Sequence, residues 1–511
     1  MGSPIRDDIF TSTMIRRAPD RATTPLPATF TLSMDPATVT FGDGNVLMGG
    51  SPLRLLRLSR RARALATSWS TGVMVGARRP EQVLARRLVS TGIFAPRPTV
   101  SAFGPPDVTV VIPVRDRPAQ LHRLLTSLDG LSCVVVDDAS SDVEGCEQIA
   151  HAGGARFIAL ETNQGPSAAR NAGLACVSTP LVAFVDSDCE PAAGWLSSLL
   201  GYFDDPLVGA VAPRIVPAEV SPPTWLSRYE AVRSSLDRGG SDGLVRPMSR
   251  IPYVPSATIV VRRAVADDAL FDPRLRGGED VDLVWRLVDA GWDVRYVPSV
   301  TVAHQGPLSV GSWLSRRSFY GTTAGPLSER HPSSMAPLHT SAWTAGVWWF
   351  ILTRRPVLAG ATLAASILVL ARRLTALVDQ PVRMAATIAG GGTAKSALPA
   401  LSGLTRAWSP LMALGLCSRR TRRSAALALL GPAINDWVAR PGDLDPVRYA
   451  TLHVADDLAY GAGVWLGCLR SRTLRPLIPK ISLRARVWSP RSLRTQLSAA
   501  DRGHSPTRGE A

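Results

Sequence analysis

Apolar runs that end in acidic residues mark the middle of the chain. Short, continuous apolar runs are typical of strands buried in a parallel sheet. Strands are predicted at 108–114 (VTVVIPV), 133–138 (CVVVDD), 155–160 and within 181–190 (LVAFVDSDCE). Helices are predicted at 118–128 and 167–177, between these strands. The alternation of strand and helix predicts an α/β domain built on a parallel sheet.

Two acidic pairs stand at the ends of predicted strands, Asp137-Asp138 and Asp186-Ser187-Asp188. Because parallel strands end at one edge of a sheet, we expect both pairs at the edge where such sheets bind ligands. Buried acids need a compensating cation, and Mg²⁺ or Mn²⁺ carrying a diphosphate suits carboxylate oxygens. For an isolated Asp-x-Asp, a surface turn with solvated acids is the alternative.

A second group of patterns follows this sheet. A helix is predicted at 194–203, a strand at 208–216, a loop over the site at 218–250 and a strand at 251–261. Glu279-Asp280 then follows two glycines at the start of a helix, where the helix dipole favours acids. A last strand leads to His304, which is either a metal ligand or a structural histidine.

The two ends of the chain differ from this middle. Residues 28–98 begin with short segments in which apolar and polar positions alternate, and helical patterns follow at 53–66 and 80–90. This predicts a small α+β, winged-helix-like module. It serves either to dock a partner or as a structural extension. Residues 95–107 hold four prolines and predict a linker.

The C-terminal third carries apolar stretches at 343–352 and 357–371, flanked by arginine pairs. Each is shorter than the roughly 18–20 residues of a confident membrane span. We expect either peripheral or marginal transmembrane attachment to the cytoplasmic side of the membrane, or a soluble helical bundle. Residues 1–25 are polar and lack a signal-peptide pattern.

The composition narrows the classes of function. A chain of 511 residues predicts two or three domains. The formal charge of +16 comes almost entirely from arginines gathered toward the ends. Without zinc-ligand spacing, a recognition helix or a stacking pattern, this charge argues for a lipid, partner or phosphorylated substrate rather than nucleic acid. Six cysteines without CxxC pairs fit a reducing, cytoplasmic compartment.

Five motifs in order now carry a resemblance: VVIPVRDR, VVVDDASSD, NQGPSAARNAG, VAFVDSDCEP and GGEDVDLVWRL. The span 107–307 resembles inverting family-2 glycosyltransferases of GT-A fold. The resemblance implies a nucleotide-sugar donor and a divalent metal, Mg²⁺ or Mn²⁺. It implies metal binding by Asp188, Asp186 and His304, and catalysis by Asp280 as the base with Glu279 orienting it. It also implies that nucleotide-sugar-binding residues are Pro113, Val114, Arg115, Asp137, Asp138, Arg170 and Ser187.

The whole chain also resembles the mycofactocin-system glycosyltransferases of actinobacteria, through motifs such as LMGGSPLRLLRLS and SFYGTTAGPLSERHP. This resemblance implies a peptide-derived redox-cofactor precursor as acceptor and repeated transfer from UDP-glucose into a β-1,4-linked chain. A precursor peptide or partner protein would dock on the N-terminal module. The alternative is a cell-envelope transferase with a lipid-linked acceptor.

The predicted organisation has five parts. They are a disordered start at 1–27, the α+β module at 28–98, the GT-A domain at 107–307, a helical, membrane-associated region at 308–483 and a basic disordered tail at 484–511.

Overall fold

The computed structural model describes residues 15–482 except 43, 129, 268, 376, 377 and 441. Residues 1–14 and the tail predicted at 484–511 lie outside the described residues. The described residues form two compact units. The first comprises the described parts of Met1–Ala336, Leu377–Asp379 and Leu401–Leu477, and the second those of Pro337–Ala376, Gln380–Ala400 and Ile478–Ala511.

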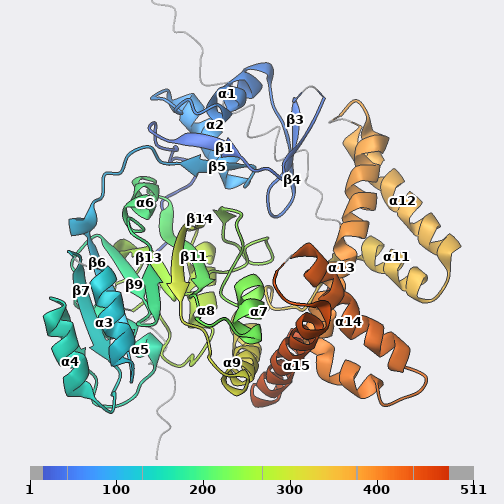
Figure 1. The fold of residues 1–511 in the computed structure, drawn as a ribbon. Coiled ribbons are helices and arrows are strands. Elements are labelled where there is room, and N and C mark those ends of the chain that lie inside the picture. Colours follow the sequence, from blue (N-terminus) through green and yellow to red (C-terminus); the bar gives the residue numbers. More distant parts are fainter. Residues whose placement is uncertain are drawn as a thin grey trace, which may run out of the picture. The chain divides into compact units, whose positions relative to one another are not determined.

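A nine-stranded mixed sheet forms the centre of the first unit (Figure 1). Its strands are β6 (Val108–Val114), β7 (Ser132–Asp137), β8 (Arg156–Ala159), β9 (Leu181–Val185), β10 (Cys189–Pro191), β11 (Val208–Pro217), β12 (Gly243–Leu244), β13 (Thr258–Arg262) and β14 (Asp293–His304). The order is β10-β14-β11-β13-β9-β6-β7-β8, with β12 paired to β14. Strands β9, β6, β7 and β8 are parallel, and β13 runs antiparallel to β9.

Helices cover both faces of this sheet. One face carries α3 (Pro118–Ser127), α4 (Val143–Ala152) and α6 (Ser197–Leu200), and the other carries α5 (Pro166–Leu174) and α8 (Glu279–Asp289). Strand residues alternate between the faces, so Val110 and Ile112 pack on the α3 side while Val111 packs on the α5 side. The continuous apolar run of β6 is therefore buried from both sides.

The N-terminal module contains two small sheets and two helices. Strand β1 (Thr31–Met34) pairs with β5 (Phe94–Arg97), and β2 (Val39–Phe41), β3 (Val46–Gly49) and β4 (Arg54–Arg57) form the other sheet beside α1 (Arg60–Ser70) and α2 (Arg79–Ser90). The helix predicted at 53–66 is wrong in its first part, because Leu55 and Leu56 pair with β3. The helix starts only after Ser59, whose side chain accepts a bond from the Ala62 N–H. Docking of a peptide or partner on this module stays a prediction.

The prediction of disorder for residues 1–27 is wrong for residues 15–27. Arg21 forms ion pairs with the buried Asp293, and Trp292 donates its indole N–H to the carbonyl of Arg16. Leu26 is fully buried. The module is further fixed by Arg86, whose guanidinium makes two 2.6 Å bonds to the buried carboxylate of Asp205. These buried charges offset the entropy that ordering the segment costs.

Helices from distant parts of the chain complete the first unit. They are α7 (Trp225–Arg233), α9 (Val310–Thr322), α10 (Ala324–Arg330), the part of α13 (Pro381–Gly415) from residue 401 onward, α14 (Arg422–Ala439) and α15 (Pro446–Arg470). Short 3-10 turns lie at η1 (Pro105–Asp107), η2 (Gly201–Asp204), η3 (Arg263–Val265) and η4 (Arg475–Leu477). The loop predicted at 218–250 thus contains α7 and β12, and the strand predicted at 251–261 begins only at Thr258.

The second unit contains a helical hairpin and a short sheet. The hairpin consists of α11 (Ala342–Leu352) and α12 (Pro356–Leu374), and the sheet pairs β15 (His339–Ser341) with β16 (Lys480–Ser482). By length and composition α12 could cross a membrane, although core helices of soluble proteins pass the same criterion. Large apolar side chains are exposed around the hairpin turn, with Leu352 77% and Val357 82% exposed.

Candidate active site

A cavity of about 1040 Å³ opens in the first unit, at the carboxyl edge of β6, β7 and β9. Every site residue predicted from the sequence lines it except Asp137. One wall is formed by the ends of strands and the start of α8. A second wall comes from α9, α13 and α15, which carry Tyr320, Arg406 and Tyr460. The parallel topology therefore brings the predicted acids together.

Asp188 and His304 are brought together by strand pairing. Cys189 of β10 pairs with His304 of β14, so the histidine lies directly beside the Asp-x-Asp segment. The His304 Nε2 atom is 3.5 Å from Asp188 Oδ1. Asp188 also forms an ion pair with Arg117, a residue of the VVIPVRDR motif to which no role was assigned from the sequence.

These two groups fit a divalent cation. Burial lowers the pKa of His304, against the opposing charge of Asp188, so the imidazole is neutral near pH 7 and can act as a ligand. Within the described residues no three histidine, cysteine or acidic side chains are grouped as a metal site. A cation held by Asp188 and His304 would take its other ligands from water and phosphate oxygens, as Mg²⁺ commonly does. The donor set thus fits Mg²⁺ or Mn²⁺ bound together with a diphosphate.

Arg170 connects the donor acids to the start of α8. Its side chain is 3% exposed and projects from α5. One terminal nitrogen is 2.6 Å from Asp186 Oδ1, and the other is 3.0 Å from Glu279 Oε1. The guanidinium also stacks on Phe271, 5.1 Å from the ring centroid. Both terminal nitrogens bind carboxylates, and the contact with the nucleotide predicted from the sequence stays a prediction.

Two glycines position the start of α8. Gly278 has φ 76°, in the left-handed region that favours glycine, and a Cβ there would lie 2.9 Å from Leu327 Cδ1. The helix then opens with Glu279 and Asp280. The sequence predicted that Glu279 orients Asp280. In the structure Glu279 bonds to Arg170, and its influence on Asp280 is through charge.

Asp280 has the properties of a general base. Burial, together with the neighbouring charge of Glu279, raises the pKa of Asp280 to about 7. The side chain lines the same cavity as Asp188 and His304. A carboxylate whose pKa lies near neutrality is suited to take a proton at physiological pH.

The acids after β7 have separate surroundings. Asp138 lines the cavity and accepts bonds from the backbone N–H groups of Gln164 and Gly165, at 2.7 and 2.8 Å. It thereby holds the turn that begins α5. Asp137 is fully buried and accepts bonds from Ser140, so its carboxylate fixes the loop after β7. Of the two, Asp138 is the one exposed to a ligand in the cavity.

The remaining predicted nucleotide-binding residues lie close to these acids. Pro113 and Val114 end β6 and Arg115 follows, and all three line the cavity. Ser187, between the two acids of Asp-x-Asp, is buried and also lines it. These placements bring the predicted residues to one cavity, while their roles toward a nucleotide stay predictions.

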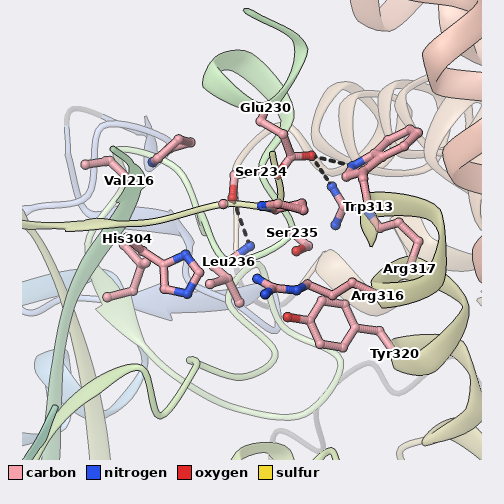
Figure 2. A pocket seen from close by; sticks show the side chains of 14 residues that line it. Val216, Glu230, Ser234, Ser235, Leu236, His304, Trp313, Arg316, Arg317 and Tyr320 are labelled. Atoms are coloured by element: carbon pink, nitrogen blue, oxygen red, sulfur yellow. Dashed lines mark hydrogen bonds and ion pairs between the residues drawn. The ribbon is translucent and has the colours of Figure 1, made fainter. Parts of the chain in front are cut away.

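A narrow pocket adjoins the cavity beside His304 (Figure 2). Figure 2 shows Arg316 and Tyr320 of α9 on the opposite side of Leu236 from His304. Above them in this view Glu230 accepts bonds from the indole of Trp313, at 2.8 Å, and from Arg317, at 2.6 Å. No site residue was predicted on α9, although the Arg316-Arg317 pair is a visible signal in the sequence there.

Known proteins are similar to this chain at two levels, one domain and nearly the whole chain. The model of the glycosyl transferase family 2 matches residues 109–270. The chain is 41% identical over 475 residues to the pre-mycofactocin glycosyltransferase of Mycobacterium tuberculosis, an alignment that covers 90% of this chain and 99% of the relative. The chain belongs to the pre-mycofactocin glycosyltransferase family. This membership and the GT-A-like fold with its mixed sheet confirm the resemblance inferred from the motifs.

More distant similarities lie outside the pre-mycofactocin glycosyltransferase family. Glycosyltransferase AglE of Haloferax volcanii is 26% identical over 212 residues, covering 39% of this chain and 67% of that protein. The mannosyltransferase PcManGT from Pyrobaculum calidifontis, solved with GDP-Man and Mn²⁺, is 17% identical over 67% of this chain and 88% of that one. Its TM-score is 0.35.

Proposed function

We propose that this chain transfers glucose from UDP-glucose, with inversion, onto a pre-mycofactocin acceptor, and that repeated transfer builds a β-1,4-linked chain. One observation carries the transfer reaction. Asp188 and His304, which suit a metal-bound diphosphate, line the same cavity as Asp280, which suits a base. The acceptor is supported by the name of the relative that matches almost the whole chain.

The chemistry of the step is a single displacement. An acceptor hydroxyl oxygen attacks the anomeric carbon from the face opposite the diphosphate, and the new carbon–oxygen bond forms as the bond to the phosphate oxygen breaks. The electron pair of that bond leaves with UDP. Asp280 takes the proton of the attacking hydroxyl, for which its near-neutral pKa suits it.

Several residues prepare the leaving group. A divalent cation held by Asp188 and His304 would neutralise charge on the departing diphosphate. Arg170 keeps Asp186 in place, and Arg117 and Arg316 add positive charge to the same cavity. Asp138 fixes the turn at Gly165, so that the wall expected to face the nucleoside is rigid.

The direct test is a transfer assay with the full chain. The purified protein is incubated with UDP-glucose, Mn²⁺ or Mg²⁺ and pre-mycofactocin, and products are analysed by mass spectrometry and NMR. The expected result is the addition of one or more hexoses, each with a β anomeric proton. Absence of hexose addition would contradict the proposed acceptor or the proposed donor, and an α linkage would contradict transfer with inversion.

A second candidate function is transfer to a lipid-linked acceptor at the membrane. The exposed apolar residues of the α11–α12 hairpin favour it, since Trp349, Leu352 and Val357 are 64%, 77% and 82% exposed and Arg354 and Arg355 lie between the helices. Apolar side chains next to arginines are typical of attachment to anionic lipid. A parallel assay with a polyprenyl-linked sugar acceptor separates the candidates, because each predicts transfer to only one acceptor.

Membrane attachment itself is tested by sedimentation with vesicles. The full chain should sediment with vesicles that contain phosphatidylglycerol, and the Trp349→Glu, Leu352→Glu variant should remain in solution. Equal sedimentation of both proteins would contradict attachment through the hairpin.

A further inference from the structure

Three tyrosines and two arginines that the reaction itself does not use line the cavity, three of them on α9, α13 and α15 and two, Arg238 and Tyr253, on loops before β12 and β13. Arg238 stacks on the ring of Tyr253 at 4.3 Å, and Arg406 stacks on the ring of Tyr460 at 4.0 Å. Tyr320 of α9 is the third ring, and all five side chains line the cavity. We call these five residues the tyrosine wall.

The tyrosine wall lines the same cavity as Asp280, the proposed base. Burial raises the pKa of Tyr320 to about 12, and the nearby charge of Asp280 contributes to the rise while Arg316 opposes it. Burial also raises the pKa of Tyr460, which lies within electrostatic reach of Arg406 and Tyr253. Asp280 and Arg406 line the same cavity, and Arg406 is joined to the wall by its stacking on Tyr460.

Close packing of helix backbones holds the wall in place. A Cβ at Gly463 of α15 would overlap the carbonyl oxygen of Ser318 on α9, and a Cβ at Gly321 would overlap the carbonyl oxygen of Tyr460. On the other side of α15, Ser409 of α13 donates a 2.6 Å bond to the carbonyl of Asp457. Tyr320, Tyr460 and Arg406 are thus fixed before a ligand arrives, which lowers the entropic cost of binding.

We propose that the tyrosine wall is an acceptor subsite that binds a sugar ring of an acceptor already carrying glucose. Flat aromatic faces cover the C–H face of a pyranose, while phenol hydroxyls and guanidinium N–H groups bond to its ring hydroxyls. A purely apolar acceptor group would leave these polar atoms without partners, at a cost in binding energy. A ring held here lies in the same cavity as Asp280, the proposed base.

This inference rests on the proposed function for its biological meaning, since a glucose-bearing molecule serves as acceptor only if transfer is repeated. It predicts that substitutions in the wall slow later transfers more than the first transfer. Variants with a weakened wall should therefore form shorter glucose chains.

Kinetics with two acceptors provide the first test. The Tyr460→Ala and Tyr460→Phe variants are compared with the unchanged protein, using unglycosylated and monoglucosylated pre-mycofactocin. Loss of one stacking ring should raise KM for the glucosylated acceptor about tenfold more than KM for the unglycosylated one. Tyr460→Phe keeps the ring and should recover most of this difference. Equal effects on both acceptors would overturn the proposal, provided that UDP-glucose binding and thermal unfolding are unchanged.

Binding of cellobiose, a β-1,4-linked glucose disaccharide, tests the subsite without any transfer. In saturation-transfer NMR with UDP present, cellobiose should receive signal from the unchanged protein and lose it with Tyr460→Ala. If the unchanged protein transfers glucose to neither acceptor, the proposed function fails and this experiment still decides the inference. Absence of cellobiose signal, or equal signal with Tyr460→Ala, would overturn the subsite.

Discussion

The two walls of the cavity are built in different ways. The sheet wall places Asp138, Asp186 and Asp188 at the ends of parallel strands, where topology brings them together. The helical wall places Tyr320, Arg406 and Tyr460 on helices spread over some 140 residues of sequence, held together by glycine contacts. The acidic side chains are therefore positioned by the sheet, and the surface available for acceptor recognition is positioned by packed helices.

The strongest test of this contrast is Arg170, the residue that ties the sheet wall to α8. Arg170→Leu would leave Asp186 and Glu279 without their buried partner, and unfolding free energy should fall by about 3–5 kcal/mol. Transfer should be lost with it. Denaturant unfolding measures the first effect and the hexose-transfer assay the second.

Arg123→Leu is the matched control, because Arg123 pairs with Glu190 on the surface, where both side chains are 42% exposed. Removing that pair should cost at most about 1 kcal/mol. Comparable destabilisation by the two variants would show that Arg170 is not the buried link described above.

The helical wall is tested at its closest backbone contact. Gly463→Ala forces α15 away from α9, since the added methyl group overlaps Ser318, and should destabilise the protein by about 1–3 kcal/mol. It should also shorten the glucose chains formed, because Tyr460 moves with α15. Thermal unfolding and product mass spectra measure both effects. Gly431→Ala in α14 meets no atom within 4 Å, so it should be neutral or stabilising. A loss as large as that of Gly463→Ala would contradict the packing argument.

A smaller effect is expected from pH. The base must be deprotonated to work, and the pKa of Asp280 is raised to about 7, so kcat/KM should fall about tenfold between pH 8 and pH 6. Glu279→Gln removes a charge that raises this pKa, and the midpoint should move to lower pH. An unchanged midpoint in the Glu279→Gln variant would show that the pH dependence does not come from Asp280.

The sheet wall was largely predictable from sequence. Apolar runs ending at Asp137 and Val185 locate the strands, and parallel pairing then dictates that their ends meet. Order at residues 15–27 was not predictable, because it depends on buried partners such as Asp293 far along the chain. The helix predicted at 53–66 was wrong in its first part. The spacing of apolar residues there fits a helix, but pairing with β3 stabilises a strand at Leu55.

The helical wall was not predictable for a similar reason. Nothing in the local pattern around Tyr460 or Arg406 indicates that the two stack on each other. Their contact depends on how closely α9, α13 and α15 approach one another. Small residues allow such an approach, but their presence in a single sequence does not predict it. Arg170 lines the cavity, but its double pairing with Asp186 and Glu279 depends on the position of α8, more than 100 residues away.

Asp280→Asn gives the most direct test of the central claim, that the sheet wall holds the donor while Asp280 activates the acceptor. Titration calorimetry with UDP-glucose and Mn²⁺ is compared with hexose transfer to pre-mycofactocin, for the unchanged protein and the variant. The account predicts donor affinity within a few fold of the unchanged protein and transfer slowed about 10²–10⁴-fold. Transfer at the unchanged rate, or loss of donor binding together with transfer, would contradict it.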